Sequence, residues 1–278
     1  MTGRDHYLEI VLRPLDRSSI LDYLGPEAAG VADRLYIHDE VDSTNLWLRR
    51  QVAERHLLSG TVCVAEAQTA GRGQHGRSWV DTPGSNIVLS VAWRFRATLA
   101  NLMGLSLAAG VAVVRALRDY GISNVGLKWP NDVVWQKKKL AGLLVESNAE
   151  SSGATVAIVG VGINVYLAER ESVRIEQPWV DLMHIVDEGV DRNSVIALLI
   201  RRLNEMLRTF ATSGFEAFRR EWERYHVFAG QSVCLRQGEL TIKARVLGVD
   251  SDGALRVIDE EGHVRVFHWG EISVRLDA

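Results

Sequence analysis

Residues 125–165 read VGLKWPNDVVWQKKKLAGLLVESNAESSGATVAIVGVGINV, and this stretch indicates the class of fold. It reads as four successive strands, at 125–129, 132–136, 140–147 and 155–165, with Lys137-Lys138-Lys139 as the turn between the second and the third. Strands that follow one another without strictly alternating helices favour an α+β fold. We expect a largely antiparallel or mixed sheet rather than a doubly wound parallel one.

Helices and further strands are predicted on both sides of this stretch. Asp42-Ser43-Thr44-Asn45 places capping side chains before an apolar run, which is typical of a helix start. The longest amphipathic helix is expected at 99–120, where Gly121 stops it. The other expected elements are strands at 7–12, 61–67 and 86–95, one or two helical turns at 18–24, and helices at 194–210 and 215–226. Together they predict a mixed sheet backed by helices.

The pattern changes after Gly230. Five short strands are expected there, separated by turn pairs such as Gln237-Gly238 and Asp252-Gly253, and they lie at 232–236, 241–249, 254–258, 264–267 and 272–276. Such a stretch suits a small β-barrel. We therefore predict a lead-in at 1–35, a main domain at 36–228 and a small C-terminal β-barrel at 229–278.

Composition narrows the class of protein. The chain has 278 residues, 47% of them hydrophobic, and a net charge of −3 with a pI near 6.3, so no basic field argues for nucleic acid as the main partner. Cys63 and Cys234 each lie in an apolar run, which favours buried reduced thiols, and no Cys/His cluster has zinc spacing. We also expect no signal segment and no run approaching ~20 apolar residues. The predicted location is the cytoplasm, away from membranes.

A glycine-rich cationic run, GRGQHGRSW, occupies residues 71–79. It satisfies G-x-G-x-x-G, but a strand and not a helix is predicted after it, so the dinucleotide-binding interpretation fails. We interpret the run as a loop between two strands that grips an anion. Arg72 and Arg77 supply planar donors for carboxylate or phosphate, and Trp79 offers a face for an adenine. The alternative is an exposed cationic hairpin with a buried tryptophan anchor.

Lys128 stands beside a stiff Trp129-Pro130 corner. A lysine held there could stabilise charge on a phosphorus or an acyl oxygen in a transition state, although a lysine at a strand end can also simply reach solvent. Further on, Gly142 permits close approach to a ligand. The glycines of Gly160-Val161-Gly162-Ile163-Asn164 would clear one face of a sheet, from which Asn164 projects. A tightly packed inner strand explains the same residues.

These motifs resemble the biotin protein ligase family, in the family's order and approximate spacing from Tyr36 to the C-terminus. The residues that carry the resemblance are Asp42-Ser43-Thr44-Asn45, Gln68, Gly71-Arg72-Gly73, Gly76-Arg77, Trp79, Lys128-Trp129-Pro130-Asn131-Asp132, Lys139-Leu140-Ala141-Gly142 and Gly160-Val161-Gly162-Ile163-Asn164. The resemblance implies the mixed sheet shared with lipoate ligases and class II aminoacyl-tRNA synthetases, with a Src-homology-like terminal barrel. It implies that biotin and ATP form biotinyl-5′-adenylate and that biotin then passes to a lysine of a carboxyl carrier protein.

The resemblance also implies roles for individual residues. The implied catalytic residues are Lys128 and Arg72. The implied biotin-binding residues are Ser43, Thr44, Asn45, Gln68, Arg72, Gly73, Gln74 and Lys128. The implied nucleotide-binding residues are Arg72, Arg77, Trp79, Asn131, Lys139, Gly142 and Asn164. Mg²⁺ would arrive with ATP; we expect no dedicated carboxylate cage and no tightly bound prosthetic group.

Two departures from the family pattern lead to expectations. Gln74 stands where the family often has a basic residue, which predicts weaker retention of the adenylate. About 40 residues precede Ser43, too few for the winged helix-turn-helix of repressor-type members, although residues 3–15 resemble its last strand and linker. We expect no sequence-specific DNA binding. A homodimer is open, since family members can pair through an exposed sheet edge.

Three other functions would share part of this pattern. A lipoate or octanoate ligase has a similar loop and lysine but an apolar acyl tunnel, whereas polar Ser43, Thr44, Asn45 and Gln68 favour a ureido ligand. A non-catalytic, biotin-responsive regulator would not need nucleotide-facing groups such as Lys128. A protein similar to aminoacyl-tRNA synthetases would need a basic tRNA-binding face, which the composition lacks.

Overall fold

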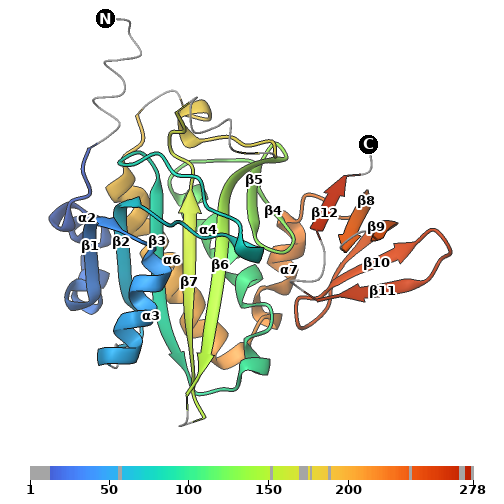
Figure 1. Cartoon of the computed structure of the whole chain (residues 1–278), viewed down its shortest axis with the longest axis horizontal. Coiled ribbons are helices and arrows are strands. Elements are labelled where there is room, and N and C mark those ends of the chain that lie inside the picture. Colours follow the sequence, from blue (N-terminus) through green and yellow to red (C-terminus); the bar gives the residue numbers. More distant parts are fainter. Residues whose placement is uncertain are drawn as a thin grey trace, which may run out of the picture.

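The larger of two sheets forms the body of the protein. The computed structural model describes residues 13–55, 58–150, 153–168, 175, 177–186, 189–237, 240–268 and 273–276. Within them, the first sheet has seven strands in the order β1-β2-β3-β7-β6-β5-β4 (Figure 1). Their bounds are β1 Leu35–Val41, β2 Thr61–Gln68, β3 Ile87–Phe95, β4 Val125–Lys128, β5 Asp132–Trp135, β6 Lys138–Ala149 and β7 Thr155–Ile163. β1 pairs in parallel with β2 and the other neighbours are antiparallel, so the predicted mixed sheet is confirmed.

Helices cover both faces of this sheet, and the alternation of side chains along the strands explains why. On β2, Val62 and Val64 join the main core, whereas Cys63 between them joins a smaller cluster with Leu48 of α3. The main core lies under α4 (Leu105–Asp119), α6 (Arg192–Ser213) and α7 (Glu216–Tyr225). The opposite face carries α3 (Thr44–Arg55), which lies in front of the sheet in Figure 1.

The lead-in is tied to this body through a buried charge. Helix α2 (Arg17–Leu24) and the 3₁₀ turns η1 (Gly25–Gly30) and η2 (Ala32–Arg34) precede β1. Just before α2, the carbonyl of Arg13 accepts a 2.9 Å hydrogen bond from the guanidinium of Arg192, which is 2% exposed. The same guanidinium pairs with Glu66 at 2.8 Å, as a buried charge requires. The strand predicted at 7–12 lies outside the described residues.

Two predictions about secondary structure are wrong. The expected helix at 99–120 is divided into η4 (Leu99–Leu102) and α4, because Gly104 between them has φ +76 and leaves no room for a Cβ beside Phe215. The longest described helix is α6, with 22 residues. The turn expected at Lys137-Lys138-Lys139 is centred on Gln136 and Lys137, which have positive φ, so Lys139 lies on β6.

The segment Leu99–Asp119 also corrects the expectation about long apolar runs. Among the described residues it is the one candidate that is long and apolar enough to cross a membrane by length and composition. In this fold 61% of its most apolar window is buried inside the protein. Its apolar character therefore matches its position as the central helix of the core.

The second sheet consists of strands from the C-terminal part of the chain. They are β8 (Ser232–Gln237), β9 (Leu240–Val249), β10 (Leu255–Asp259), β11 (Val264–Phe267) and β12 (Ser273–Leu276), paired antiparallel in the order β11-β10-β9-β8-β12. All five lie where the sequence predicts strands. Within the described residues no pairing joins β11 to β12, so the described strands form an open sheet, at the right in Figure 1.

Candidate functional site

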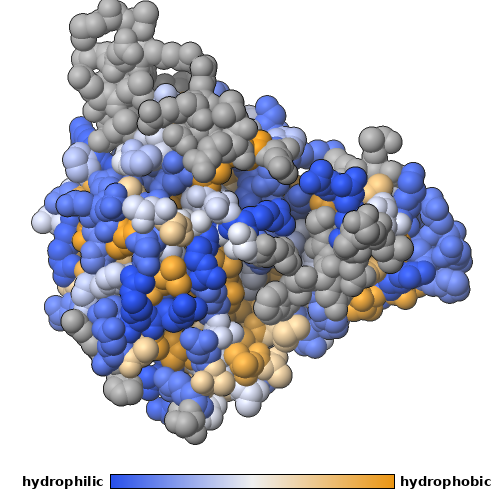
Figure 2. Space-filling model, in the orientation of Figure 1, coloured by the Kyte–Doolittle hydropathy of each residue, from blue (hydrophilic) through white to orange (hydrophobic). Residues whose placement is uncertain are grey.

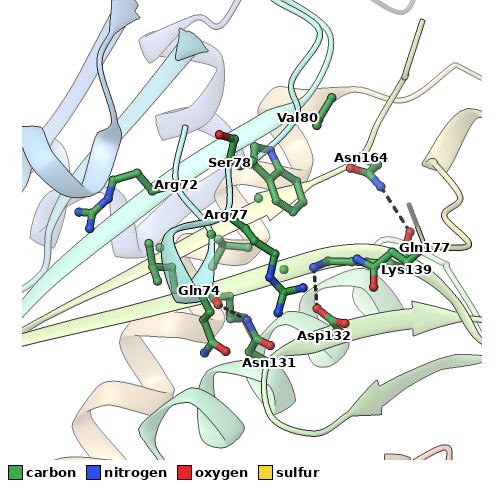
Figure 3. A pocket seen from close by; sticks show the side chains of 18 of the residues that line it. Arg72, Gln74, Arg77, Ser78, Val80, Asn131, Asp132, Lys139, Asn164 and Gln177 are labelled. Carbon is green, nitrogen blue, oxygen red and sulfur yellow. Dashed lines mark hydrogen bonds and ion pairs between the residues drawn. The ribbon is translucent and has the colours of Figure 1, made fainter. Parts of the chain in front are cut away.

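A cavity of about 450 Å³ lies where strand ends, the glycine-rich loop and the second sheet meet (Figure 3). This volume lies within the range of ordinary small-ligand pockets. The cavity brings together every site residue predicted from the sequence. These residues are Ser43, Thr44, Asn45, Gln68, Arg72, Gly73, Gln74, Arg77, Trp79, Lys128, Asn131, Lys139, Gly142 and Asn164.

One end of the cavity carries buried, uncharged polar groups. Ser43, Thr44 and Asn45 lie at the start of α3 and are buried. Gln68, at the end of β2, accepts hydrogen bonds from the Thr44 backbone N–H at 2.9 Å and from its hydroxyl at 3.3 Å. Polar atoms held in this way favour a ligand with both donors and acceptors.

Two residues that the sequence reasoning missed extend this polar end into a network. The Ser90 hydroxyl lies 2.7 Å from Thr44 Oγ1 and donates a 2.6 Å hydrogen bond to Asn45 Oδ1. The Asn45 amide donates in turn to Glu146 Oε2 at 2.9 Å. A signal for Ser90 exists in the sequence, since it is the single polar residue in the apolar run 87–93. Glu146 offers no comparable signal because it lies near the exposed end of a long strand.

The glycines of β6 and β7 make room for two side chains of the protein, Trp79 and Asn45. A Cβ on Gly162 would lie 2.6 Å from Trp79 Cε2, and a Cβ on Gly142 would lie 2.9 Å from Trp79 Cζ3. A Cβ on Gly160 would overlap the Asn45 side chain. Side chains of the protein therefore occupy the space that these glycines clear, as the alternative of a tightly packed inner strand describes, and a contact of Gly142 with a nucleotide stays a prediction. The glycines seat Trp79 and Asn45 on the cavity wall.

The opposite end of the cavity is cationic. Asp132, the last residue of the KWPND motif, lies with one oxygen 2.6 Å from Lys139 Nζ and the other 3.8 Å from Lys128 Nζ. Burial lowers the pKa of Lys128, and the positive charges of Lys139, Arg275 and Arg77 lower it further, whereas Asp132 acts in the opposite direction. Asp132 is therefore the carboxylate that lies between the two lysines.

Arg275 is the contribution of the second sheet. It belongs to β12 and lines the cavity together with Val274. Nothing local in the sequence distinguishes one exposed arginine near the end of the chain. The fold places Arg275 on the same cavity as Lys128.

Arg72 does not lie with the lysines in this structure. Its guanidinium pairs with Glu146 at 2.8 Å, and Figure 3 shows it directed away from Lys139 and Asp132. With 41% of its side chain exposed, it is anchored by a pair that water screens. Its predicted contact with the reacting groups therefore requires the loop to move.

Two asparagines predicted to contact the nucleotide form part of the wall. The Asn131 amide donates to the Leu143 carbonyl at 2.8 Å, next to the lysine strand. The Asn164 amide donates to the carbonyls of Lys139 and Val180, at 3.3 Å and 3.1 Å. These bonds hold the edges of the cavity in place.

The donor set for a metal is small. Among the described residues that line the cavity, Asp132 is the one carboxylate, and both of its oxygens face lysines. Mg²⁺ commonly takes one or two protein carboxylates and substrate phosphates. The cavity therefore fits a Mg²⁺ ion that arrives with phosphates better than one held in a protein cage.

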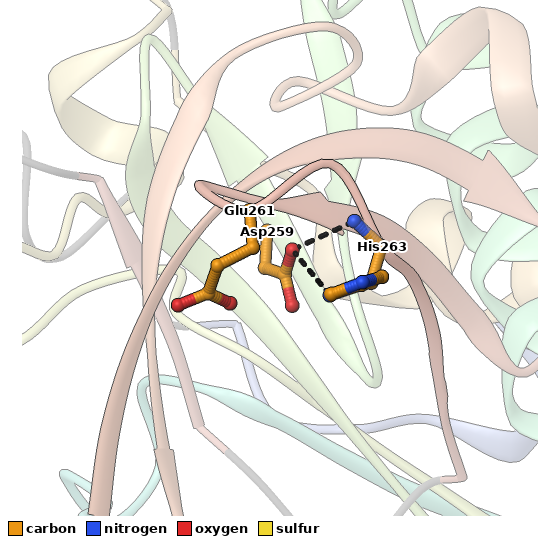
Figure 4. A group of neighbouring side chains, drawn as sticks. All are labelled: Asp259, Glu261 and His263. Atoms are coloured by element: carbon orange, nitrogen blue, oxygen red, sulfur yellow. Dashed lines mark hydrogen bonds and ion pairs between the residues drawn. The ribbon is translucent and has the colours of Figure 1, made fainter.

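A group elsewhere, Asp259, Glu261 and His263, has ligand atoms within 4.8 Å of one another (Figure 4). Asp259 Oδ2 lies 2.6 Å from Arg265 Nε, and Asp259 Oδ1 accepts from the His263 backbone N–H at 2.8 Å. Arg265 thus already neutralises the buried carboxylate. We interpret the group as a brace for the β10–β11 hairpin.

Comparisons with known proteins match both parts of the chain. The description "Biotin/lipoate A/B protein ligase family" matches residues 38–164, and "Biotin protein ligase C terminal domain" matches residues 228–275. The bifunctional ligase/repressor BirA of Escherichia coli K12 is 37% identical over 235 residues, which cover 84% of this chain and 72% of that protein. The biotin–[acetyl-CoA-carboxylase] ligase of Mycobacterium tuberculosis is 34% identical over 273 residues, which cover 95% and 92%. A structure of biotin protein ligase from Aquifex aeolicus in complex with biotin and ATP has a TM-score of 0.72 at 30% identity, covering 88% of this chain and 99% of that one.

Proposed function

The chain belongs to the biotin protein ligase family and is a biotin ligase, and we propose that its cavity forms biotinyl-5′-adenylate from biotin and ATP and then transfers biotin to a lysine of a carrier protein. One observation carries the proposal. A single cavity joins a buried uncharged polar end, at Thr44 and Asn45, to a cationic end at Lys128 and Lys139. A ligand with a ureido head and a carboxylate tail matches that order of groups.

In the first half-reaction, a carboxylate oxygen of biotin attacks the α-phosphorus of ATP and pyrophosphate leaves. Negative charge develops on the phosphoryl oxygens, so preorganised cations at that point lower the barrier. Lys128 would contact the reacting carboxylate and the α-phosphate, while Lys139, Arg77 and Arg275, which line the same cavity, would surround the nucleotide phosphates. Asp132, which lies 2.6 Å from Lys139 and 3.8 Å from Lys128, would hold both lysines within reach of the phosphates.

In the second half-reaction, the neutral amine of a carrier lysine attacks the acyl carbon of the mixed anhydride. The bond to the phosphate oxygen breaks, AMP leaves, and the amine loses a proton to become the amide. The same cations stabilise the phosphate that departs. Arg72 and Gly73 would close over biotin in both steps, which requires Arg72 to exchange Glu146 for the ligand.

The magnesium ion would come with ATP and neutralise charge on the triphosphate. Asp132 is the residue of the cavity whose chemistry suits it. Because Lys139 lies 2.6 Å from Asp132, Mg²⁺ would share that carboxylate with a lysine or reach it through water.

The proposal extends to the domain bounds, a dimer surface and the cellular compartment. The catalytic domain would comprise residues 36–228 and the small domain residues 229–278. A homodimer would use β1, which among the described strands is an edge strand of the first sheet, with β2 on one side. Cys63 is a buried free thiol, which fits a reducing compartment such as the cytoplasm.

The test is a release assay for pyrophosphate in which biotin, lipoate or octanoate is the sole acyl donor. We expect release with biotin alone, and a strong reduction in Lys128→Ala. Release with lipoate or octanoate would move the chain to a neighbouring function within the family. Tight biotin binding without release would favour a regulator.

A further inference from the structure

We propose that Trp129 is a positioning residue that fixes the second sheet against the lysine strand, so that Arg275 faces the nucleotide end of the cavity. The inference rests on the proposed function, because it concerns how the ATP-binding end of that cavity is assembled. Trp129 follows Lys128 directly in the chain, yet its side chain points into the contact between the two sheets.

The first observation is a buried hydrogen bond across that contact. Trp129 is 1% exposed, and its indole N–H donates to the carbonyl oxygen of Gly253 at 3.0 Å, between residues 124 positions apart. A buried donor and acceptor that lose each other cost more free energy than the bond contributes when formed. The bond therefore favours the one relative position of the two sheets in which the indole N–H of Trp129 reaches the Gly253 carbonyl.

The second observation is the shape of the turn that carries Gly253. Asp250 Oδ1 accepts from the backbone N–H groups of Asp252 and Ala254, both at 2.9 Å, and closes the β9–β10 turn. Gly253 has φ +82, and a Cβ there would lie 2.8 Å from Leu107 Cδ1 and 3.0 Å from Gly104 Cα. The turn thus fits against the start of α4 with no space to spare.

The third observation is a second attachment on the other side of Lys128. The backbone N–H of Val227 donates to the Leu127 carbonyl at 2.9 Å, where the chain crosses from α7 toward β8. Gly126 makes room for the Val227 side chain. Leu127 and Trp129 therefore both hold the C-terminal part of the chain, while Lys128 between them faces the cavity.

These attachments determine where Arg275 lies. The turn at Gly253 is continuous with β9, β9 pairs with β8, and β8 pairs with β12, in which Arg275 stands opposite Cys234. The backbone hydrogen bonds between these paired strands resist sliding, so a shift of the turn at Gly253 would also shift β12. Loss of the Trp129 bond would move Arg275 relative to Lys128 without touching the polar end of the cavity.

The test is a double-mutant cycle on initial rates of pyrophosphate release, with ATP varied at saturating biotin. Trp129→Phe removes the donor and keeps an aromatic ring, and Arg275→Gln removes the charge. We expect each change to raise KM for ATP about tenfold, and the double variant to show about the same tenfold rise, because Trp129 acts through Arg275. KM for biotin should stay unchanged in all three.

A second pair of variants covers the case in which Trp129→Phe does not fold. Asp250→Ala loosens the turn, and Asp250→Asn keeps a side-chain oxygen that accepts the same N–H groups. We expect Asp250→Ala to raise KM for ATP, non-additively with Arg275→Gln, and Asp250→Asn to have a KM for ATP like that of the wild type.

The matched control for Trp129→Phe is Trp93→Phe, since Trp93 is half-buried on β3 and does not line the cavity.

The outcomes distinguish failure of the positioning role of Trp129 from failure of the proposed function. Independent effects, seen as a rise of about a hundredfold in the double variant, would overturn the positioning role. So would an equal rise of KM for biotin in Trp129→Phe, which would indicate general loosening. A wild-type protein without biotin-dependent release would overturn the proposed function, and this inference with it.

Discussion

The side chain of Asn45 fills the space that a Cβ on Gly160 would need. The start of α3 can therefore pack closely against the middle of β7 because residue 160 has no side chain. Gly160 is thereby explained by a neighbour and not by backbone flexibility. The contact aims the Asn45 amide at Glu146 and leaves its oxygen to Ser90.

Gly160→Ala should weaken biotin binding. The added methyl displaces Asn45 from its network, and we expect KM for biotin to rise about tenfold, the effect of one lost buried hydrogen bond, with KM for ATP unchanged. Gly30→Ala is the control, because the position is open and has no positive φ. An unchanged KM for biotin in Gly160→Ala would show that Asn45 does not contact this substrate.

Asp132→Asn should move the alkaline limit of activity to lower pH. Burial, followed by three neighbouring cations, lowers the pKa of Lys128, and the carboxylate of Asp132 opposes that effect. Activity that needs a protonated Lys128 is lost as pH rises through this pKa, and the variant lowers the pKa further. Profiles of kcat/KM against pH test the shift. Coinciding alkaline limbs would exclude Lys128 as the titrating group.

His226→Phe should reduce the acid sensitivity of folding. Burial lowers the pKa of His226 to about 4, from an ordinary value of 6.5, and its ring lies 4.5 Å from that of Trp222. Between pH 6.5 and about 4, His226 is protonated in the unfolded chain but stays neutral in the folded protein. The contribution of His226 to the free energy of unfolding is therefore intact above pH 6.5 and lost as pH falls toward 4, with a ceiling on the order of 3 kcal/mol.

Urea titrations of wild type and His226→Phe at pH 7.5 and 5 measure that difference. The free energy of unfolding of the wild type should fall more between the two values than that of the variant. Asp81 has a raised pKa of about 6, also from burial, and acts in the opposite direction, so the comparison between the two proteins is the informative quantity. Equal falls would mean that His226 is not the acid-sensitive group.

Gln74→Arg should slow the release of biotinyl-adenylate. Gln74 lines the cavity in the glycine-rich loop, three residues before Arg77. A charge-assisted hydrogen bond to the adenylate phosphate would slow dissociation by about tenfold. Trapping the released adenylate in a single-turnover experiment measures the off-rate. An unchanged off-rate would refute the expectation that the neutral amide weakens retention.

Much of the site could be predicted because its motifs are local. Asp42-Ser43-Thr44-Asn45 stands at the start of α3, and Lys128 ends β4, and both follow from short-range pattern. Glu146 and Arg275 could not be assigned in the same way. Each is an ordinary charged residue on a strand, and its importance comes from partners that are distant in the sequence.

By itself, the sequence determined most of the strands and helices, because apolar periodicity, caps and turn glycines act over a few residues, and its resemblance to a family singled out many of the residues that line the cavity. The tertiary structure alone decided which groups meet. Trp79 and Asn45 fill the space that glycines clear, Asp132 lies between two lysines, and Trp129 reaches Gly253. These contacts depend on how the sheets and loops pack against each other, which no local pattern encodes.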